Sequence, residues 1–480
     1  MPDRPNIVLI ITDQQRYDTI AALGFPQLQT PNLDRLVSEG VSFDNCFVNA
    51  PSCGPARCSF FSGLYPHSTG MLRNEQLWSQ TWVPNLASAG YFTASIGKMH
   101  FTPFDVEGQF DYRFNVENKQ RGHPYPTPES YRDEWDKALA ERGMDKYHPG
   151  DLAKRANFDS AIGAFPWEKD PDMHPDNFLG RSAVEWIEGY EREDPLFLEI
   201  GFPGPHPPYD PTPDWIARYA DTEFPLLPLA EEERASQPPV FRDMARLQYD
   251  GRPGDSTMLP PDPTPDQRQR QRRFYMANVS MIDVWIGRIR DSLERRGLLE
   301  NSVIIFTSDH GDTLTDHYSS QKWTMYDQVV RVPAIVWAPG RFDGGRRIAG
   351  QIEWFDLGAT ILEIAGAEFP DPFEASSLVG ALSGEPFAGR EFAFSEMGRW
   401  DIVGLTTDYM TMVRTSKWKL VHFIDQPHGQ LFDLINDPGE LRNRFADPEV
   451  RVQRDLLVQA MTEWRMRSNA TTAGWRADRR

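Results

Sequence analysis

At 480 residues, with 40% hydrophobic side chains and a formal net charge of −20, the chain is long enough for a sizeable core and is strongly acidic. Its length exceeds the size at which a single core usually stops growing, so we expect one large domain and one smaller domain. The acidic balance disfavours a non-specific nucleic-acid binder, which would carry a basic field. An enzyme of this charge that acts on an anion has to gather its positive side chains locally.

The cysteines and the first residues indicate the compartment. Cys46, Cys53 and Cys58 are the only cysteines, and a cluster within thirteen positions is no disulfide framework for so long a chain. This usage is typical of a reducing compartment. The N-terminal residues show no long apolar stretch with a cleavage site, and no segment approaches the ~18 uninterrupted apolar residues of a membrane span. We therefore expect a cytoplasmic protein without a membrane partner, and we leave a homo-oligomer open.

Three apolar runs predict strands of a central sheet. Residues 7–11 are apolar at consecutive positions, as in strands that are buried on both faces of a parallel sheet. The run 302–307 is likewise apolar from 303 to 306, and the run 196–202 is apolar apart from Glu199. Residues 274–297 carry apolar side chains at spacings of three and four and end at Gly297. This pattern predicts an amphipathic helix that leads into the third strand, which indicates an α/β architecture with helices against a large sheet.

Two long segments, 119–180 and 224–268, are rich in Pro, Asp, Glu, Arg and Tyr and lack sustained periodicity. Loops of this length in a compact domain are usually functional. We therefore predict lids or binding loops here. The alternative is that these segments are peripheral and have no role in binding.

The C-terminal part follows a different pattern. After about residue 370 the chain changes to short mixed segments and closes with a basic amphipathic helix. These expected strands and the helix cover residues 391–394, 409–414, 418–423, 429–434 and 448–468. They predict an antiparallel sheet in a small α+β domain. We therefore divide the chain into an α/β domain, residues 1–370, and an α+β domain, residues 371–480.

Polar side chains follow the first and third strands at their carboxyl ends, where ligands of open α/β sheets bind. Asp13 and Gln14 follow the first strand, and Asp309 and His310 follow the third. If the strands are neighbours, these donors suit one divalent cation, and the oxygens favour Ca²⁺, Mg²⁺ or Mn²⁺. The spacing alone leaves open that Asp309 caps a turn and Asp13 caps a helix.

Five cationic or imidazole side chains are candidates for binding an anion. They are Arg57, Lys98, His100, His206 and Lys322. A single lysine or histidine is more often solvated, or a satisfied core residue, than catalytic. Residues 94–96 precede Lys98 as residues 196–202 precede His206, and this repeated placement after apolar runs favours a site.

One short segment combines a cysteine with a proline two residues on and an arginine four residues on. It is Cys53-Gly54-Pro55-Ala56-Arg57. By itself this segment also fits an ordinary turn, because Gly-Pro pairs are common in turns and loops. It occurs in order with three further motifs, at 90–100, at 308–312, and at Lys322 followed by 326–327 and 331–333.

Together these motifs resemble the type I sulfatases, which belong to the alkaline phosphatase superfamily. The resemblance extends from Asn6 to residues 431–440 and so covers nearly the whole chain. It implies an alkaline phosphatase-like fold with a large mixed central sheet, flanking helices and a smaller C-terminal domain. It also implies a hydrolase of organic sulfate monoesters, with a small-molecule sulfate ester as the substrate.

The resemblance implies that a formylglycine-generating enzyme oxidises Cys53 to an aldehyde, whose hydrate is the nucleophile. One cation, Ca²⁺, Mn²⁺ or Mg²⁺, would then be bound by residue 53 together with Asp13, Gln14, Asp309 and His310. In such a site the cation would lower the pKa of the hydrate, and Asp309 would accept its proton. The sulfate on residue 53 would leave when the second hydroxyl collapses to the aldehyde.

The remaining candidates would bind the hydrate and the sulfate group. Arg57 would hold the hydrate and His100 would hydrogen-bond it. Lys98, His206 and Lys322 would grip the sulfate oxygens, and His206 or Lys322 would protonate the departing alcohol. Asn74 is a weaker candidate for contacting the ester group.

Many arylsulfatases have Asp at the position of Gln14 and Asn at the position of His310. The chain departs from them at both positions, and it looks closer to the choline sulfatase and phosphonate monoester hydrolase branches. A phosphonate monoester or phosphate diester hydrolase is therefore the main alternative, since it would use the same residues. Four aromatic residues could stack on an aryl or cationic leaving group, or simply pack. They are Trp135, Trp167, Tyr209 and Trp323.

Other classes fit the residues less well. A two-metal phosphatase needs additional Asp and His ligands that we do not find. A cysteine phosphatase needs more residues between Cys53 and Arg57, and the cysteine spacing does not suit structural zinc. A non-catalytic protein remains open if Cys53 stays unmodified.

Overall fold

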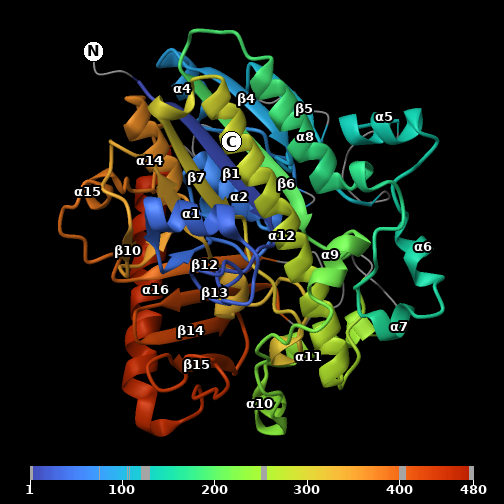
Figure 1. Ribbon diagram of the computed structural model, residues 1–480. Coiled ribbons are helices and arrows are strands. Elements are labelled where there is room, and N and C mark those ends of the chain that lie inside the picture. The colour runs from blue at the N-terminus through green and yellow to red at the C-terminus, as the bar shows by residue number, and fades with distance from the viewer. Residues whose placement is uncertain are drawn as a thin grey trace.

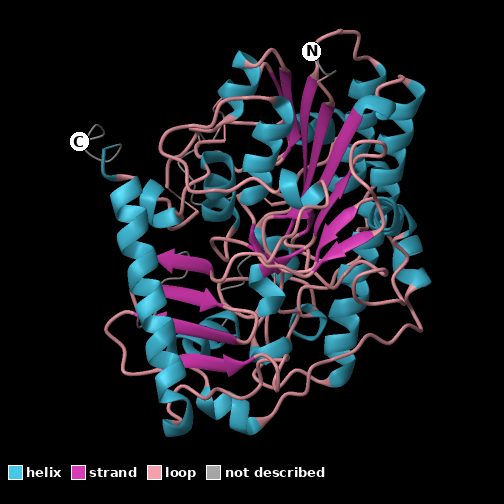
Figure 2. Cartoon of the chain, turned by 90° about the vertical axis from the view of Figure 1, so that its left-hand side faces the viewer, coloured by secondary structure: helices cyan, strands magenta, loops and turns pink. Residues whose placement is uncertain are grey.

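The computed structural model describes residues 4–74, 76–104, 106, 109–120, 130–249, 257–398 and 407–474. Figure 1 shows a central sheet flanked by helices, and Figure 2 shows a second, smaller sheet beside a long helix. The chain therefore forms the expected α/β architecture with an antiparallel C-terminal sheet. Among the described residues no helix has both the length and the apolar character needed to cross a membrane.

The central sheet is built around β1 (Asn6–Asp13), which is parallel to both β6 (Leu196–Pro205) and β7 (Ser302–Ser308). The strands lie in the order β10-β2-β9-β7-β1-β6-β4-β5. The other members are β2 (Val41–Phe43), β4 (Phe92–Gly97), β5 (Tyr112–Asn115), β9 (Ala334–Trp337) and β10 (Arg346–Ile348). Because β9 runs antiparallel to β7 and β2, the sheet is mixed, as predicted.

The two faces of β1 enter two different hydrophobic cores. Ile7, Leu9 and Ile11 belong to one core and Val8 and Ile10 to the other, because successive side chains of a strand point to opposite faces. The first core includes residues of α2 (Cys53–Ser62), α4 (Val83–Ser88) and α14 (Asp356–Ala365). The second includes residues of α1 (Pro31–Glu39), α8 (Pro175–Glu188) and α12 (Pro265–Arg295). Helices on both faces explain why the strand is apolar at consecutive positions.

The C-terminal sheet shares a core with the central part of the molecule. Its antiparallel strands are β12 (Ala393–Gly398), β13 (Tyr409–Arg414), β14 (Trp418–Phe423) and β15 (Gly429–Asp433). On one face, Val413 and Leu420 pack with Trp464 of α16 (Arg451–Thr471). On the other face, Met412 and Val421 join the first core of the central sheet. A domain boundary at residue 370 stays a prediction.

Short elements connect these parts. A three-stranded sheet consists of β3 (Cys46–Phe47), β8 (Arg331–Val332) and β11 (Ile352–Glu353). The short helices include α3 (Pro66–Thr69), α9 (Pro213–Arg218), α13 (Asp327–Val330) and α15 (Val379–Leu382).

Two expectations need correction. Helix α12 begins at Pro265 rather than near residue 274, because Thr264 and Gln267 form a capping box at its start. The long segments that were expected to be loops contain helices where the structure describes them. These are α5 (Glu134–Glu141), α6 (Pro149–Ala153), α7 (Phe158–Ala161), α10 (Glu231–Ser236) and α11 (Pro239–Tyr249). Residues 121–129 and 250–256 lie outside the described residues, and a lid function stays a prediction.

Candidate active site

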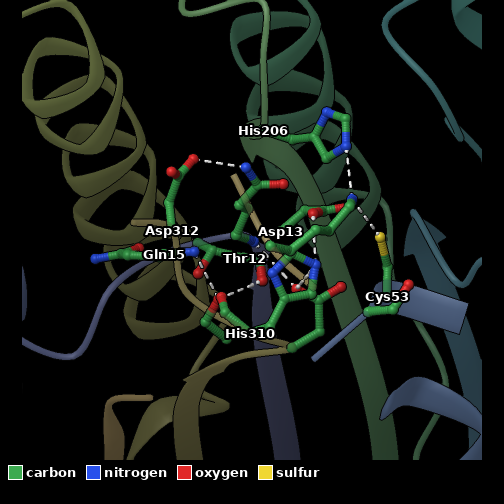
Figure 3. Close-up of polar contacts among 12 residues, drawn as sticks. Thr12, Asp13, Gln15, Cys53, His206, His310 and Asp312 are labelled. Carbon is green, nitrogen blue, oxygen red and sulfur yellow. Dashed lines mark hydrogen bonds and ion pairs between the residues drawn. The ribbon is translucent and has the colours of Figure 1, made fainter. Parts of the chain in front are cut away.

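The candidate site lies at the carboxyl ends of four neighbouring parallel strands. Asp13 is the last residue of β1, while Asp309, His206 and Lys98 directly follow β7, β6 and β4. These strands are adjacent in the order β7-β1-β6-β4. Parallel neighbours end at the same edge of the sheet, so the fold brings these side chains together. Figure 3 shows Asp13 and His206 in one group with Cys53.

Cys53 enters this group from the start of a helix. It is the first residue of α2, and Arg57 stands one turn later on the same side of the helix. Asn74 Oδ1 accepts hydrogen bonds from the Gly54 N–H at 2.8 Å and from the Ser52 hydroxyl at 3.1 Å. Asn74 thus holds the start of α2 and positions Cys53, while its contact with an ester stays a prediction.

Arg57 is fixed by a buried ion pair. Its Nε donates to Asp309 Oδ2 at 2.8 Å, and both side chains are fully buried. The same guanidinium donates to the backbone carbonyl of Lys98. The pair joins α2 to the ends of β7 and β4, so the nucleophile position and the strand ends are held in one arrangement.

The donors predicted to bind a cation converge in the structure. Ligand atoms of Asp13, Cys53, Asp309 and His310 all lie within 4.8 Å of one another. His310 Nε2 lies 3.8 Å from Asp13 Oδ1 and 3.7 Å from Asp309 Oδ1. Besides Asp13 Oδ2, which forms an ion pair with Lys98, three buried atoms of this group have no hydrogen-bond partner among the described residues, namely Asp13 Oδ1, Gln14 Oε1 and His310 Nε2. Unpartnered buried donors and acceptors are costly, and a cation would satisfy these three at once.

The backbone at Gln14 is also unusual. Its φ of 74° lies in the left-handed region, which costs a non-glycine residue energy and is common at functional sites. The conformation is held because Gln14 N–H donates to Asp309 Oδ1 at 3.1 Å. As a result, the chain turns sharply at the end of β1, directly beside Asp13, and the role of Gln14 as a cation ligand stays a prediction.

Two lysines reach the same group of residues around Cys53 and Asp13. Lys322 Nζ lies 3.0 Å from Cys53 Sγ and 3.0 Å from His206 Nε2. Lys98 forms an ion pair with Asp13, and its Nζ donates to Asn118 Oδ1 at 3.2 Å. Positive charge is therefore concentrated here, as the acidic chain requires for an anionic ligand.

His100 is buried at the edge of this group. The backbone N–H of His100 donates to Glu117 Oε2 at 3.0 Å, and its backbone carbonyl accepts from Trp78 Nε1 at 2.8 Å. Burial, together with the nearby charge of Lys98, holds the pKa of His100 well below its usual value. The imidazole is therefore neutral at neutral pH, and its contact with residue 53 stays a prediction.

Burial and neighbouring charges set the protonation of the site. Burial alone would raise the pKa of Asp13, but the charges of Lys98 and Lys322 outweigh it and hold that pKa well below its usual value. Burial raises the pKa of the Cys53 thiol to about 12, and Asp13 adds to this effect. Burial and the charge of Lys322 lower the pKa of His206. At neutral pH Asp13 is thus ionised, while the thiol and the His206 imidazole are neutral.

Of the four aromatic residues that could stack on a substrate, two belong to the core. Trp135 and Trp167 are buried in the second core with ring centroids 6.3 Å apart, so the packing alternative holds for them. Tyr209 is also buried and donates to Asp312 at 2.7 Å. Trp323 follows Lys322, and its backbone N–H donates to the Pro51 carbonyl at 3.1 Å.

Two polar partners of the site were not predicted from the sequence. Asn118 holds Lys98, and Asp312 accepts from Gln14 Nε2 at 2.6 Å. Asp312 could have been noticed, because it lies in the same short motif as Asp309 and His310. Asn118 carries no comparable signal, since it lies in an irregular segment.

Comparisons with known proteins find matches over nearly the whole chain. The family model described as Sulfatase matches residues 5–367, and the model described as N-sulphoglucosamine sulphohydrolase, C-terminal, matches residues 315–467. An arylsulfatase of Clostridium perfringens is 28% identical, over 95% of this chain and 93% of that protein. A choline-sulfatase of Rhizobium meliloti is 29% identical, over 95% of this chain and 85% of that protein.

A solved structure has the same fold. The phosphonate monoester hydrolase of Agrobacterium radiobacter superposes with a TM-score of 0.81 at 24% identity, covering 97% of this chain and 96% of that one. The alkaline phosphatase-like fold expected from the sequence is thereby confirmed.

Proposed function

The chain belongs to the sulfatase family and is a sulfuric ester hydrolase, and we propose that it cleaves organic sulfate monoesters with a formylglycine formed from Cys53. The surroundings of the Cys53 sulfur carry this proposal. Cys53 Sγ lies 3.0 Å from Lys322 Nζ and belongs to the group of ligand atoms that lie within 4.8 Å of one another. The sulfur stands where an oxygen of the aldehyde hydrate would stand.

The thiol itself is a poor candidate for the nucleophile. With a pKa of about 12 it is almost wholly protonated at neutral pH, and the thiolate is the reactive form of cysteine. Position 53 therefore suits a residue that reacts through oxygen. Because Cys53 is only 1% exposed, we propose that a formylglycine-generating enzyme modifies it before the chain folds.

The donor set fits one divalent cation. Oxygens of Asp13, Gln14 and Asp309 and the imidazole of His310 would hold it, and an oxygen at position 53 would complete a set that favours Ca²⁺, Mn²⁺ or Mg²⁺. Such a cation would polarise a sulfuryl oxygen and lower the pKa of a hydroxyl on residue 53.

The chain's own residues would hold the sulfate and manage the proton. Lys98 and Lys322 would offset the charge of the sulfate oxygens in a water-poor site, where electrostatic stabilisation is strongest. Lys322 would also donate a proton to the departing alcohol, because its ammonium lies beside both position 53 and His206. Arg57, fixed by Asp309, would hold residue 53 on the helix face that meets the sulfate.

A phosphonate monoester hydrolase remains the alternative, because a phosphonate monoester has the same charge and tetrahedral shape as a sulfate monoester. The structural likeness to such an enzyme shows the shared fold. Location in the cytoplasm and self-association stay predictions from the sequence.

Parallel kinetics separate the two activities. We would measure kcat/KM on an aryl sulfate and on an aryl phosphonate monoester with the same leaving group, using protein whose formylglycine has been verified by peptide mass. We expect a preference for the sulfate of about tenfold or more. A higher kcat/KM for the phosphonate would overturn the proposal, and Cys53→Ala serves as the control for activity that does not come from this site.

A further inference from the structure

The Gln14 side chain is held at one end of its amide and left open at the other. Gln14 Nε2 donates to Asp312 Oδ2 at 2.6 Å, whereas Gln14 Oε1 is buried without a hydrogen-bond partner among the described residues. The backbone is held as well: the N–H donates to Asp309 at 3.1 Å, and the carbonyl accepts from the Tyr275 hydroxyl at 2.6 Å. Oε1 is thus the one polar atom of Gln14 that is left to bind a cation.

We propose that Asp312 is a positioning residue, which selects the orientation of the Gln14 amide that presents Oε1 to the cation; this inference rests on the cation site of the proposed function. A glutamine amide has an oxygen end and an NH₂ end of nearly the same shape, and only the oxygen binds a cation. A carboxylate accepts hydrogen bonds and donates none. Asp312 therefore pairs with the NH₂ end and leaves the oxygen for the cation.

The Asp312 carboxylate is itself fixed by four donors. Its Oδ2 accepts from Gln14 Nε2 and from the Tyr209 hydroxyl, which lies at 2.7 Å. Its Oδ1 accepts from the backbone N–H groups of Leu314 at 2.8 Å and Gln321 at 3.0 Å. Figure 3 shows this side chain beside the group formed by Asp13 and His310. Because all four partners donate, an amide at position 312 could accept with its oxygen from only one pair of them. Its NH₂ group would face the other pair.

The same carboxylate links the two halves of the site. Tyr209 lies three residues after His206, and Gln321 directly precedes Lys322. Asp312 therefore contacts the segments that carry a cation ligand and both members of the Lys322–His206 pair. Replacing a residue that holds a metal ligand in this way typically lowers metal affinity or activity by about 10–100-fold.

A matched set of variants isolates the orientation of the amide. In Asp312→Asn the two backbone N–H groups still require an oxygen, so the new NH₂ faces Gln14. That NH₂ donates to the Gln14 oxygen, and the Gln14 NH₂ then faces the cation. Adding Gln14→Glu restores the cation ligand, because a carboxylate accepts from position 312 with one oxygen and offers the other to the cation.

The test is Mn²⁺ binding to the metal-free full-length protein, measured by titration calorimetry. We expect Asp312→Asn to raise the Kd for Mn²⁺ by about 10–100-fold, and Asp312→Asn/Gln14→Glu to return it to within about threefold of wild type. Tyr209→Phe is the matched control, because it removes a donor to the same oxygen while the contact with Gln14 remains. Its Kd should stay within about threefold of wild type.

An unchanged Kd in Asp312→Asn, or a loss that the double variant does not recover, would overturn the inference. If Asp312→Asn alone does not fold, the double variant carries the test, since the proposal requires it to fold and to bind Mn²⁺ near the wild-type affinity. Wild-type protein that binds no Mn²⁺ and hydrolyses no sulfate ester would instead count against the proposed function.

Discussion

Lys322 Nζ lies 3.0 Å from His206 Nε2 in the buried centre of the site. His206 Nδ1 lies 2.8 Å from the Pro207 carbonyl, which only accepts, so Nδ1 carries a proton and donates it to that oxygen. Burial and the Lys322 charge lower the pKa of His206, so the neutral ring accepts at Nε2 from the Lys322 ammonium. This geometry places the available proton on Lys322.

Lys322→Ala should therefore slow turnover in a way that depends on the leaving group. For an alkyl sulfate, whose alkoxide leaves poorly without a proton, we expect kcat to fall by about 10²–10⁴-fold, as is typical of a lost general acid. For 4-nitrophenyl sulfate the loss should be much smaller, because the phenolate is stable without protonation. Steady-state kinetics on both substrates check this.

His206→Ala is the companion variant. It removes the group that orients the ammonium and leaves the proton donor in place, so its loss on the alkyl sulfate should be smaller than that of Lys322→Ala. The opposite ranking would show that His206 supplies the proton.

Any Cys53 that escapes conversion should be nearly inert in the folded protein. Because burial and the Asp13 charge raise the pKa of its thiol to about 12, the thiolate fraction at pH 8 is only about 10⁻⁴. The rate of alkylation by iodoacetamide should keep rising about tenfold per pH unit above pH 9, without levelling off. Mass spectrometry of the peptide that contains Cys53 gives the rate. Levelling near pH 8.5 would instead indicate an ordinary, exposed thiol.

The cation should stabilise the folded protein as well as support turnover. A chelator should abolish activity, and saturating Mn²⁺ or Ca²⁺ should restore it and raise the melting temperature by about a few degrees, because the ion binds the native state. In Asp13→Asn, which loses a ligand and the partner of Lys98, added cation should produce no such rise. A full cation response in that variant would place the ion elsewhere.

Asp316 should contribute stability that depends on pH. Burial alone would raise its pKa, but Arg272 at 2.5 Å and Arg16 at 3.0 Å outweigh it and hold the pKa well below its usual value. A group of this kind stabilises the fold above the unfolded-state pKa of about 3.9, and this contribution is lost as pH falls below that value. Asp316→Asn should lower stability at pH 7 by about 3–5 kcal/mol, because it removes the carboxylate partner of the buried Arg272, while Arg16 keeps its ion pair with Asp18.

Denaturant unfolding at pH 7 and at pH 3 measures this effect. The difference between wild type and Asp316→Asn should shrink at pH 3. Asp262→Asn is the control, because Asp262 pairs with Arg234 while its side chain is 78% exposed. Its effect should stay within about 1 kcal/mol. A constant difference at both pH values would contradict the assignment to Asp316.

The central strands and their end residues were predictable because the physical signal is local. A strand between two helical layers is apolar at consecutive positions, and parallel neighbours end at one edge, so Asp13, Asp309 and His206 could be expected together. The role of Cys53 came from resemblance, because its spacing to Arg57 alone also fits a turn.

Other features depend on contacts between distant segments. The first turns of α12 are polar, and Arg268 and Arg272 are buried there through Asp316, so hydrophobic periodicity placed the start of the helix too late. The contact between Gln14 and Asp312 joins residues 298 positions apart. Such a pairing depends on the register of β1 against β7, which no local pattern encodes.

The most direct test of the central claim compares the extent of conversion at position 53 with turnover. Preparations that range from unconverted to fully converted would be made with and without a formylglycine-generating enzyme, and the converted fraction would be read from the mass of the peptide that contains residue 53. We predict that the kcat for 4-nitrophenyl sulfate is proportional to this fraction and reaches zero for the unconverted protein and for Cys53→Ala. Turnover that is independent of the converted fraction would contradict the account.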